Sequence, residues 1–385
     1  MDMMQKYPRI SDMVGPAERR LPKFVHAYLA AGTGIGQAMH KNEQALSEIE
    51  LMPRFLRGRV APDTSCSIFG QAYAAPFGIA PVGLQSLIWP NGERLLAKAA
   101  ADHKIPYTLS TVAGADLETI GPIAGDMGWF QLYTPSDKAV MRDLLARAKA
   151  AGFKTLLVTV DVPGPSRREE MRLAGAPIGS RNPMALTPRV FWQCMTHPGW
   201  SLAALANGGK FSFKNLVRYS KPEDGDDITT FIGRQLNGSL TWEYLEEIRQ
   251  EWDGPLIVKG ILHADDARQA VKAGADGLVI SNHGGRQLDP GPSSIAALRQ
   301  IAPQYRGKIP LFLDSGVTSG VDIARAYACG ADYVFLGRSF VFGVAAMGPK
   351  GAYHTTNMLT KQLDQTLHQL RCPRPDLLPL HLVDR

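Results

Sequence analysis

The chain has 385 residues, 45% of them hydrophobic, and a formal net charge of +6 at pH 7. Such a composition indicates a globular protein with a large core and excludes an intrinsically disordered chain. The four cysteines are far apart and form no CxxC pair, so we expect neither a disulfide framework nor a bound metal. No apolar run approaches the roughly 20 residues of a membrane-spanning helix, and the N-terminus lacks the apolar segment of a secretion signal, so a cytoplasmic protein is expected.

Eight short apolar runs alternate with amphipathic stretches between residues 77 and 340. Runs that are apolar on both faces and separated by helices indicate a parallel sheet. Eight such units in roughly 260 residues predict an α/β fold of the (β/α)8 TIM barrel type. The predicted strands are residues 77–83, 106–112, 129–133, 155–163, 256–261, 277–284, 310–316 and 333–340.

Two regions fall outside this pattern, within a single predicted barrel domain over residues 1–385. Residues 1–76 contain the helix-like stretch "LPKFVHAYLAAG" and are expected to form an N-terminal cap over one end of the barrel. Residues 164–240, after the fourth strand, greatly exceed the roughly 2–6 residues of an ordinary βα loop. They are predicted to form an inserted lid or a membrane-association segment.

Polar side chains gather where the predicted strands end. Barrel enzymes carry their active sites at this end, on the loops that follow the strands. One such residue alone would be ordinary loop polarity, but the whole ring predicts a functional site. Its members are Ser110, Gln131, Tyr133, Thr159, Asp161, Lys259, Ser281, His283, Arg286, Asp314 and Arg338.

The residue types suggest the chemistry of this site. His283 titrates near neutral pH and is the natural general base. Arg286 and Arg168 offer planar guanidinium groups that suit a carboxylate, although a lone arginine is usually a surface ion pair. Asp161 closes a buried strand and needs a partner, for which a protonated histidine is one candidate. Lys259 could form a Schiff base or neutralise an anionic cofactor.

Two glycine-containing segments end the seventh and eighth predicted strands. These are "DSGVTSG" (314–320) and "LGR" (336–338). Backbone N–H groups at this place in a barrel commonly bind phosphate, although neither segment is strong evidence by itself.

These motifs together resemble the FMN-dependent α-hydroxy-acid dehydrogenase and oxidase family, which includes L-lactate dehydrogenase, (S)-mandelate dehydrogenase and glycolate oxidase. The stretch "SNHGGRQLD" (281–289) is close to the signature of that family. The resemblance continues through "IAPVGL", "WFQLY", "TVDVP" and "GADYVFLGR", and covers residues 21 to 345. It implies FMN as the cofactor and oxidation of an (S)-2-hydroxy acid, lactate-like or mandelate-like, to the 2-oxo acid.

The resemblance also implies roles for individual residues. His283 would be the base and Asp161 the carboxylate that orients it, with Tyr133 and Arg286 completing the catalytic set. The implied substrate-binding residues are Tyr28, Tyr133, Arg168, Arg286, Gly83 and Val112. The implied flavin-binding residues are Ala80, Pro81, Val82, Ser110, Gln131, Thr159, Lys259, Asp314, Gly316, Gly337 and Arg338.

Three positions depart from the pattern that the resemblance suggests. Gly83 and Val112 stand where glycolate oxidase has alanine and tryptophan, so the pocket is expected to admit a larger side chain than glycolate. Thr318 stands where the family often has a phosphate-binding arginine, and its hydroxyl, with that of Ser315, is expected to compensate. Asp289 is expected to structure its own loop rather than to take part in catalysis.

Residues 171–222 contain no Asp or Glu but seven Lys or Arg. Cations with exposed aromatic residues suit an anionic membrane surface, so peripheral attachment to the cytoplasmic face is expected. The alternative is a folded lid whose aromatics belong to the core. Nucleic acid is not an expected partner, because the rest of the chain indicates an enzyme. The apolar residues concerned are Phe191, Trp192, Trp200, Leu202, Leu205, Phe211, Phe213 and Leu216.

Several properties stay open at this stage. The electron acceptor is expected to be a quinone of the respiratory chain, with oxygen as the alternative and hydrogen peroxide as its product. The resemblance implies a homotetramer. A hydride and a carbanion mechanism cannot be told apart, and an FMN-dependent isomerase or a noncatalytic flavoprotein are the less favoured functions.

Overall fold

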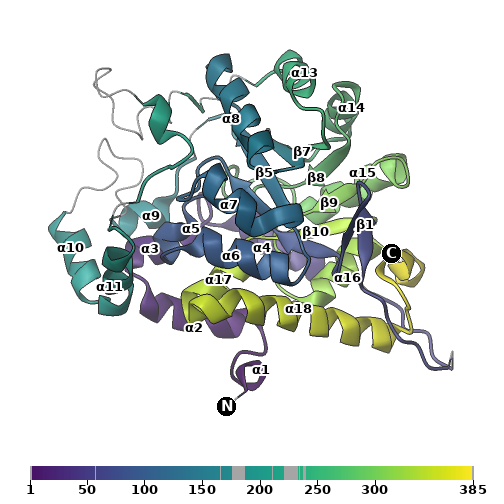
Figure 1. Ribbon diagram of the computed structural model, residues 1–385. Coiled ribbons are helices and arrows are strands. Elements are labelled where there is room, and N and C mark those ends of the chain that lie inside the picture. The colour runs from purple at the N-terminus through teal and green to yellow at the C-terminus, as the bar shows by residue number, and fades with distance from the viewer. Residues whose placement is uncertain are drawn as a thin grey trace.

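The computed structural model describes residues 2–56, 58–164, 166–175, 187–209, 211–220, 233, 235–236 and 240–383. Eight parallel strands close into a barrel in the order β10-β3-β4-β5-β6-β7-β8-β9 (Figure 1). They are β3 (Phe77–Ile79), β4 (Tyr107–Ser110), β5 (Gly128–Tyr133), β6 (Thr155–Thr159), β7 (Leu256–Ile261), β8 (Gly277–Ile280), β9 (Leu311–Leu313) and β10 (Tyr333–Leu336). Each predicted run overlaps one of these strands, so the predicted (β/α)8 barrel is confirmed.

One helix follows each strand and packs around the barrel. Side-chain caps mark several helix starts; Asp137, Thr241, Ser293 and Ser319 each accept a hydrogen bond from the first turn that follows. The eight helices are α6 (Gly92–Asp102), α7 (Leu117–Ala124), α8 (Lys138–Ala150), α13 (Trp242–Glu251), α14 (Ala264–Lys272), α15 (Ser294–Tyr305), α16 (Gly320–Ala328) and α17 (Arg338–Met347). Two short helices precede barrel elements: α5 (Gln85–Ile88) lies before α6, and η1 (Gly125–Met127) lies before β5. After α17 come α18 (Pro349–Leu370) and η4 (Pro375–His381).

Aromatic side chains fill the N-terminal half of the barrel. Trp129, Phe312, Tyr333 and Phe335 pack against one another with ring centroids 5.3–6.1 Å apart. The antiparallel hairpin of β1 (Cys66–Ile68) and β2 (Gln71–Tyr73) covers this end, with Phe69 beside Trp129. Because this half is closed and apolar, a site that needs polar groups lies at the opposite end.

The N-terminal segment reaches both ends of the barrel rather than the one end predicted for residues 1–76. Its hairpin lies at the N-terminal end, whereas Tyr28 lines a cavity at the C-terminal end. Helix α2 runs along α17, and Arg20 at its end hydrogen-bonds the Ala346 carbonyl. The four helices are α1 (Met3–Lys6), α2 (Ile10–Arg20), α3 (Lys23–Ala30) and α4 (Gln37–Ser47).

The insert after β6 contains α9 (Glu169–Leu173), α10 (Pro188–Met195), α11 (Pro198–Ala206) and η2 (Val217–Tyr219). Helices α10 and α11 project at one side of the molecule, at the left of Figure 1. The apolar side chains of this segment divide between the two alternatives, because some are exposed, as a membrane surface requires, and others belong to the core. Trp200 is buried, donates its indole N–H to the Leu87 carbonyl and stacks on Phe211, and Leu216 is also buried.

Four members of the predicted set are exposed on this pair of helices: Phe191, Trp192, Leu202 and Leu205. Met195 is exposed as well, and Phe213 is half-buried. The basic residues Arg181, Lys210 and Lys221 lie outside the described residues. None of the described helices is both long and apolar enough to span a membrane.

Candidate active site

A cavity of about 750 Å³ opens at the C-terminal ends of the barrel strands. Most of the predicted site residues line it, namely Tyr28, Ala80, Pro81, Val82, Gly83, Val112, Tyr133, Thr159, Arg168, Lys259, His283, Arg286, Asp314, Gly316, Gly337 and Arg338. Ser110, Gln131 and Asp161 are not part of the lining. Each of the three hydrogen-bonds a residue that does line the cavity: Val112, Thr159 and His283, respectively.

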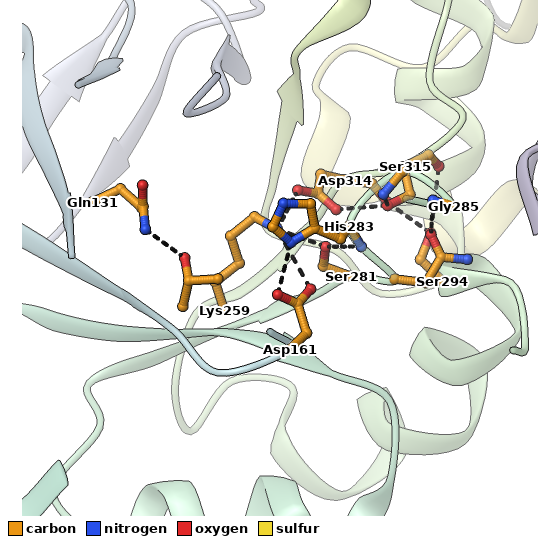
Figure 2. A network of polar contacts seen from close by, with 12 residues as sticks. Gln131, Asp161, Lys259, Ser281, His283, Gly285, Ser294, Asp314 and Ser315 are labelled. Atoms are coloured by element: carbon orange, nitrogen blue, oxygen red, sulfur yellow. Dashed lines mark hydrogen bonds and ion pairs between the residues drawn. The ribbon is translucent and has the colours of Figure 1, made fainter. Parts of the chain in front are cut away.

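The imidazole of His283 points toward Asp161 (Figure 2), with Nδ1 2.8 Å from the carboxylate Oδ1. With the Nδ1 proton donated to Asp161, Nε2 accepts a hydrogen bond from the Tyr133 hydroxyl at 3.2 Å. Burial lowers the pKa of His283 below its ordinary value, and Lys259 and Arg286 add to this, although Asp161 opposes it. The histidine is therefore a neutral base near pH 7.

Burial by itself would raise the pKa of Asp161, but the charges of His283 and Lys259 outweigh burial and hold that pKa below its ordinary value. Its second oxygen, Oδ2, lies 3.9 Å from Lys259 Nζ and accepts no hydrogen bond from the described residues. Asp161 is thus a largely buried anion, placed to stabilise the imidazolium that forms when His283 takes up a proton.

Lys259 extends from β7 into the same network and is buried. Its ammonium group donates to Ser281 Oγ at 2.8 Å and pairs with Asp314 Oδ2 at 3.1 Å. Burial lowers the pKa of Lys259, but Asp314 and Asp161 more than offset this and keep the pKa above its ordinary value. Asp314 and Asp161 thus favour the charged ammonium, which disfavours the predicted alternative of a Schiff-base amine, because that amine must be neutral to attack.

The loop after β8 holds His283 in an uncommon backbone conformation. His283, Gly284 and Gly285 have φ angles of 56°, 65° and 72°. His283 N donates to Ser281 Oγ and Gly284 N donates to Ser315 Oγ, and these bonds fix the turn. A Cβ atom at Gly285 would lie 2.7 Å from Met39 N, so the glycine lets α4 approach the loop.

Three arginines meet at one side of the cavity. Within the described residues, neither Arg168 nor Arg286 pairs with an acidic side chain, and Arg168 Nε is buried without a hydrogen-bond partner. Burial and the charges of Arg168 and Arg338 lower the pKa of Arg286 well below its ordinary value. Three mutually repelling, partly buried cations favour the binding of an anion.

Tyr28, Gly83 and Val112 close the cavity beside these arginines. The Tyr28 hydroxyl donates to the Gly83 carbonyl at 2.9 Å, and the Arg286 guanidinium lies 5.4 Å from the centre of the Tyr28 ring. A Cβ atom at Gly83 would lie 2.8 Å from Val112 Cγ2 and 3.1 Å from the Tyr28 hydroxyl. Only glycine leaves this corner open.

Three predicted flavin-binding residues form a hydrogen-bonded row beneath the cavity. Ser110 Oγ donates to Gln131 Oε1 at 2.7 Å, and Gln131 Nε2 donates to Thr159 Oγ1 at 3.0 Å. All three side chains are buried. This row fixes the orientation of the Thr159 hydroxyl, which lines the cavity.

Gly316 and Gly337 line the cavity with Arg338, whose guanidinium donates to the Leu29 and Ala31 carbonyls that Arg286 also binds. Gly316 has a φ of 85°, and a Cβ atom there would lie 2.7 Å from Asn42 Cβ. Burial and the charge of Arg168 lower the pKa of Arg338 to about 10. This cationic, glycine-lined part of the cavity suits a phosphate group.

The hydroxyl groups of Thr318 and Ser315, predicted to compensate for a missing arginine at the phosphate, both donate to aspartate carboxylates in this structure. The Thr318 N–H and hydroxyl both donate to Asp322 Oδ2, at 3.1 and 3.2 Å. Ser315 Oγ donates to Asp314 Oδ1 at 2.8 Å. Both protons are already engaged, so Arg338 is the cation that remains for a phosphate among the predicted residues.

Two structural contacts were not predicted. Asn42 and Asn282 exchange side-chain hydrogen bonds at 2.8 and 2.9 Å and tie α4 to the loop that carries His283. Ser281 Oγ joins Lys259 to the His283 backbone. Asp289, expected to structure its own loop, instead accepts from the N–H groups of Ile35 and Ala38 in the N-terminal segment.

The family described as FMN-dependent dehydrogenase matches residues 17–384. The chain belongs to this family. It is therefore an oxidoreductase with FMN as cofactor, as predicted. L-lactate dehydrogenases from Pseudomonas entomophila (strain L48) and Ectopseudomonas mendocina (strain ymp) are 41% and 40% identical to it, over 92% of this chain and 92% of each relative.

Solved structures show the same relationship. A crystal structure of the monotopic membrane protein (S)-mandelate dehydrogenase is 32% identical, with a TM-score of 0.91 over 99% of this chain and 100% of that chain. A crystal structure of mandelate oxidase is 32% identical, with a TM-score of 0.82 over 98% of each chain.

The residues of the cavity fit FMN. The buried Lys259 ammonium and the Thr159 hydroxyl, which Gln131 holds from outside the lining, suit the polar edge of an isoalloxazine ring. Ala80, Pro81 and Val82 line the cavity as an apolar wall on which a flat ring can lie. Gly316, Gly337 and Arg338 suit the phosphate. The cavity therefore has polar, apolar and cationic residues that suit the ring edge, the ring face and the phosphate of FMN, respectively.

Proposed function

We propose that this protein oxidises an (S)-2-hydroxy acid of the lactate or mandelate type to the 2-oxo acid. The observation that carries the proposal is the position of a neutral base, His283, in the same cavity as Arg168 and Arg286. A base beside an unpaired cationic cluster suits a substrate that has a carboxylate next to an oxidisable carbon. The relatives named L-lactate dehydrogenase and (S)-mandelate dehydrogenase support the same substrate class.

Arg168 and Arg286 bind the substrate carboxylate in this proposal, because their buried charges lack acidic partners among the described residues. Tyr28 stacks near Arg286 and adds a hydroxyl at the same corner. The Tyr133 hydroxyl, 3.2 Å from His283 Nε2, binds the oxygen that is oxidised. Together these groups place the reacting carbon at the base.

His283 Nε2 takes a proton from the substrate, either from the hydroxyl or from Cα. Asp161, 2.8 Å from Nδ1, stabilises the imidazolium that forms. Bound FMN supplies the two-electron acceptor for this oxidation. Lys259 keeps a fixed positive charge at the strand end of β7, where it stabilises negative charge in the cavity.

The corner beside Gly83 determines how large a substrate side chain fits. Glycine at this position and valine at residue 112 leave more room than alanine and tryptophan would. We infer that the side chain of the substrate is larger than that of glycolate. Mandelate, which has a phenyl group, is the upper size that the named relatives suggest.

We further propose that the α10–α11 pair attaches the protein to the cytoplasmic face of a membrane and that a quinone is the electron acceptor. Phe191, Trp192, Met195, Leu202 and Leu205 are exposed on the two helices. The exposed cations of the same segment are Arg172, Arg189, Lys214 and Arg218. Apolar residues with cations suit an anionic bilayer surface, and one structural neighbour is described as a monotopic membrane protein. Oxygen is the alternative acceptor, supported by the neighbours named mandelate oxidase.

Steady-state turnover tests the substrate class. The purified holoenzyme should oxidise L-lactate or (S)-mandelate with an artificial acceptor and should leave D-lactate and (R)-mandelate unchanged. Replacing the artificial acceptor with a soluble quinone analogue should sustain turnover, whereas oxygen should sustain it slowly. Equal rates with both enantiomers, or no turnover of any 2-hydroxy acid, would contradict the proposed substrate.

Sedimentation with vesicles tests the attachment. The wild type should bind vesicles that contain anionic lipid, and Trp192→Ser should weaken this binding, because the side chain is 69% exposed. A matched control is Leu377→Ser, since Leu377 is another solvent-accessible apolar residue but lies far along the chain in η4. Equal binding by both variants and the wild type would argue against this surface.

A further inference from the structure

Gln193 lies on α10 but directs its side chain away from the exposed face of that helix. It is only 7% exposed. Its Oε1 accepts a hydrogen bond from Phe24 N at 2.9 Å, and its Nε2 donates to the Ala174 carbonyl at 2.9 Å. One amide group therefore bridges α3 and α9, from which it is separated by 169 and 19 residues in the sequence.

Each contact serves one backbone group at a helix end, Phe24 N or the Ala174 carbonyl, for which the described residues provide no other hydrogen bond. The first N–H groups of a helix have no acceptor within the helix, and Pro22, the N-cap of α3, provides no side-chain cap. Gln193 supplies that acceptor from another helix. At α9, the last carbonyl groups need donors, and Gln193 supplies one to Ala174, the C-cap residue.

The two helices that Gln193 joins carry the residues assigned to the substrate carboxylate. Tyr28 follows Phe24 by four residues on α3, so both side chains lie on the same face of the helix. Arg168 is the N-cap of α9, a helix of only five residues. Ala27, Ala31 and Met171 form a small buried cluster between the helices. A shift of either helix end therefore moves Tyr28 or Arg168.

We propose that Gln193 is a positioning residue for the substrate carboxylate, which it affects through Tyr28 and Arg168 without touching the substrate. This inference rests on the proposed function, because it assumes a carboxylate substrate at these two residues. It assigns a second task to α10. One face of the helix is exposed to solvent, and the other sets the geometry of the substrate site.

The test compares three holoenzyme variants. Gln193→Met keeps the volume of the side chain and removes both hydrogen bonds. Gln193→Glu keeps an acceptor for Phe24 N but loses the donor to Ala174. Val190→Ala, a buried apolar change on the same helix, is the packing control. The measurements are KM and kcat for L-lactate and (S)-mandelate, the Kd of pyruvate from the flavin spectrum, and the Kd of FMN.

For Gln193→Met we expect KM and the pyruvate Kd to rise by about tenfold, the effect of losing one or two buried hydrogen bonds, while kcat changes by less than about threefold. Gln193→Glu should show a smaller rise, and Val190→Ala should leave KM unchanged. FMN affinity should be the same in all variants. A Gln193→Met enzyme with wild-type KM, or a Val190→Ala enzyme with the same rise in KM, would overturn the inference. A wild type that oxidises no 2-hydroxy acid would instead refute the proposed function.

Discussion

His283 and Asp161 meet at 2.8 Å although 122 residues separate them in the sequence. Asp161 follows β6 and His283 follows β8, so the barrel brings together two strand ends that are not neighbours. The contact fixes the Nδ1 proton and leaves Nε2 facing the cavity. Lys259, from the strand between them, lies 3.9 Å from Asp161 and completes the charge arrangement.

Replacing His283 with Gln removes the base. We expect kcat/KM for L-lactate or (S)-mandelate to fall by about 10²- to 10⁴-fold, the usual contribution of a general base. FMN content measured by absorbance should stay at the wild-type level, because His283 lies on the substrate side. Turnover within threefold of wild type would exclude His283 as the base.

The dependence of kcat/KM on pH reports the protonation of His283. Burial holds its pKa below the ordinary value of about 6.5, so activity should fall only as the pH drops below that value. Asp161→Asn removes a charge that raises the pKa of His283. The acid limb of the profile should therefore move to still lower pH, with a lower plateau. An acid limb above pH 7 in the wild type would contradict this description of the site.

Arg168→Met should weaken substrate binding. The buried guanidinium has an unpartnered Nε, and charge-assisted hydrogen bonds contribute about 1.5–3 kcal/mol, so we expect KM to rise by about 10- to 100-fold. Arg168→Lys should recover part of the loss, because the charge remains without the planar fork. If neither variant changes KM, the carboxylate does not bind at Arg168.

Gly83→Ala tests the corner of the pocket. The added methyl group would lie 2.8 Å from Val112 Cγ2, so we expect KM for (S)-mandelate to rise more than KM for L-lactate. Combining it with Val112→Ala should restore part of the mandelate activity, since the neighbouring methyl groups are removed. Equal effects on both substrates would show that this corner does not contact the substrate side chain.

Thr318→Arg should strengthen FMN binding. The hydroxyl of Thr318 is engaged by Asp322, and an arginine there would add a second cation to the phosphate end beside Arg338. We expect the Kd of FMN to fall by about tenfold or less, since Asp322 would compete for the new charge. The Kd of riboflavin, which has no phosphate, should not change. A similar change for both ligands would place the effect away from the phosphate.

The sequence was sufficient for the barrel because its signal is local. Each strand is a short apolar run between amphipathic segments, and a barrel directs all the strand ends to one face. That rule predicts that His283, Asp161 and Lys259 lie in one site, because each follows or ends a barrel strand. It could not supply the Asn42–Asn282 pair, because nothing local links two asparagines that lie 240 residues apart.

For the insert after β6, the sequence did not predict which side chains are exposed. A basic, acid-free segment with aromatic residues has the same composition whether those residues face solvent or the core. Trp200 and Leu216 belong to the same predicted set as the exposed residues, but tertiary packing on Leu87 and the barrel helices buries them. The role of Gln193 could not be predicted from the sequence, because its two hydrogen-bond partners are backbone groups of other helices.

Anaerobic reduction of the bound flavin tests the central claim most directly. The holoenzyme is mixed without oxygen with L-lactate, and separately with (S)-mandelate, and the flavin absorbance is followed in the wild type and in His283→Gln. We expect at least one acid to bleach the wild-type flavin rapidly and the variant far more slowly. A flavin that dithionite reduces but no 2-hydroxy acid bleaches would contradict the proposed function.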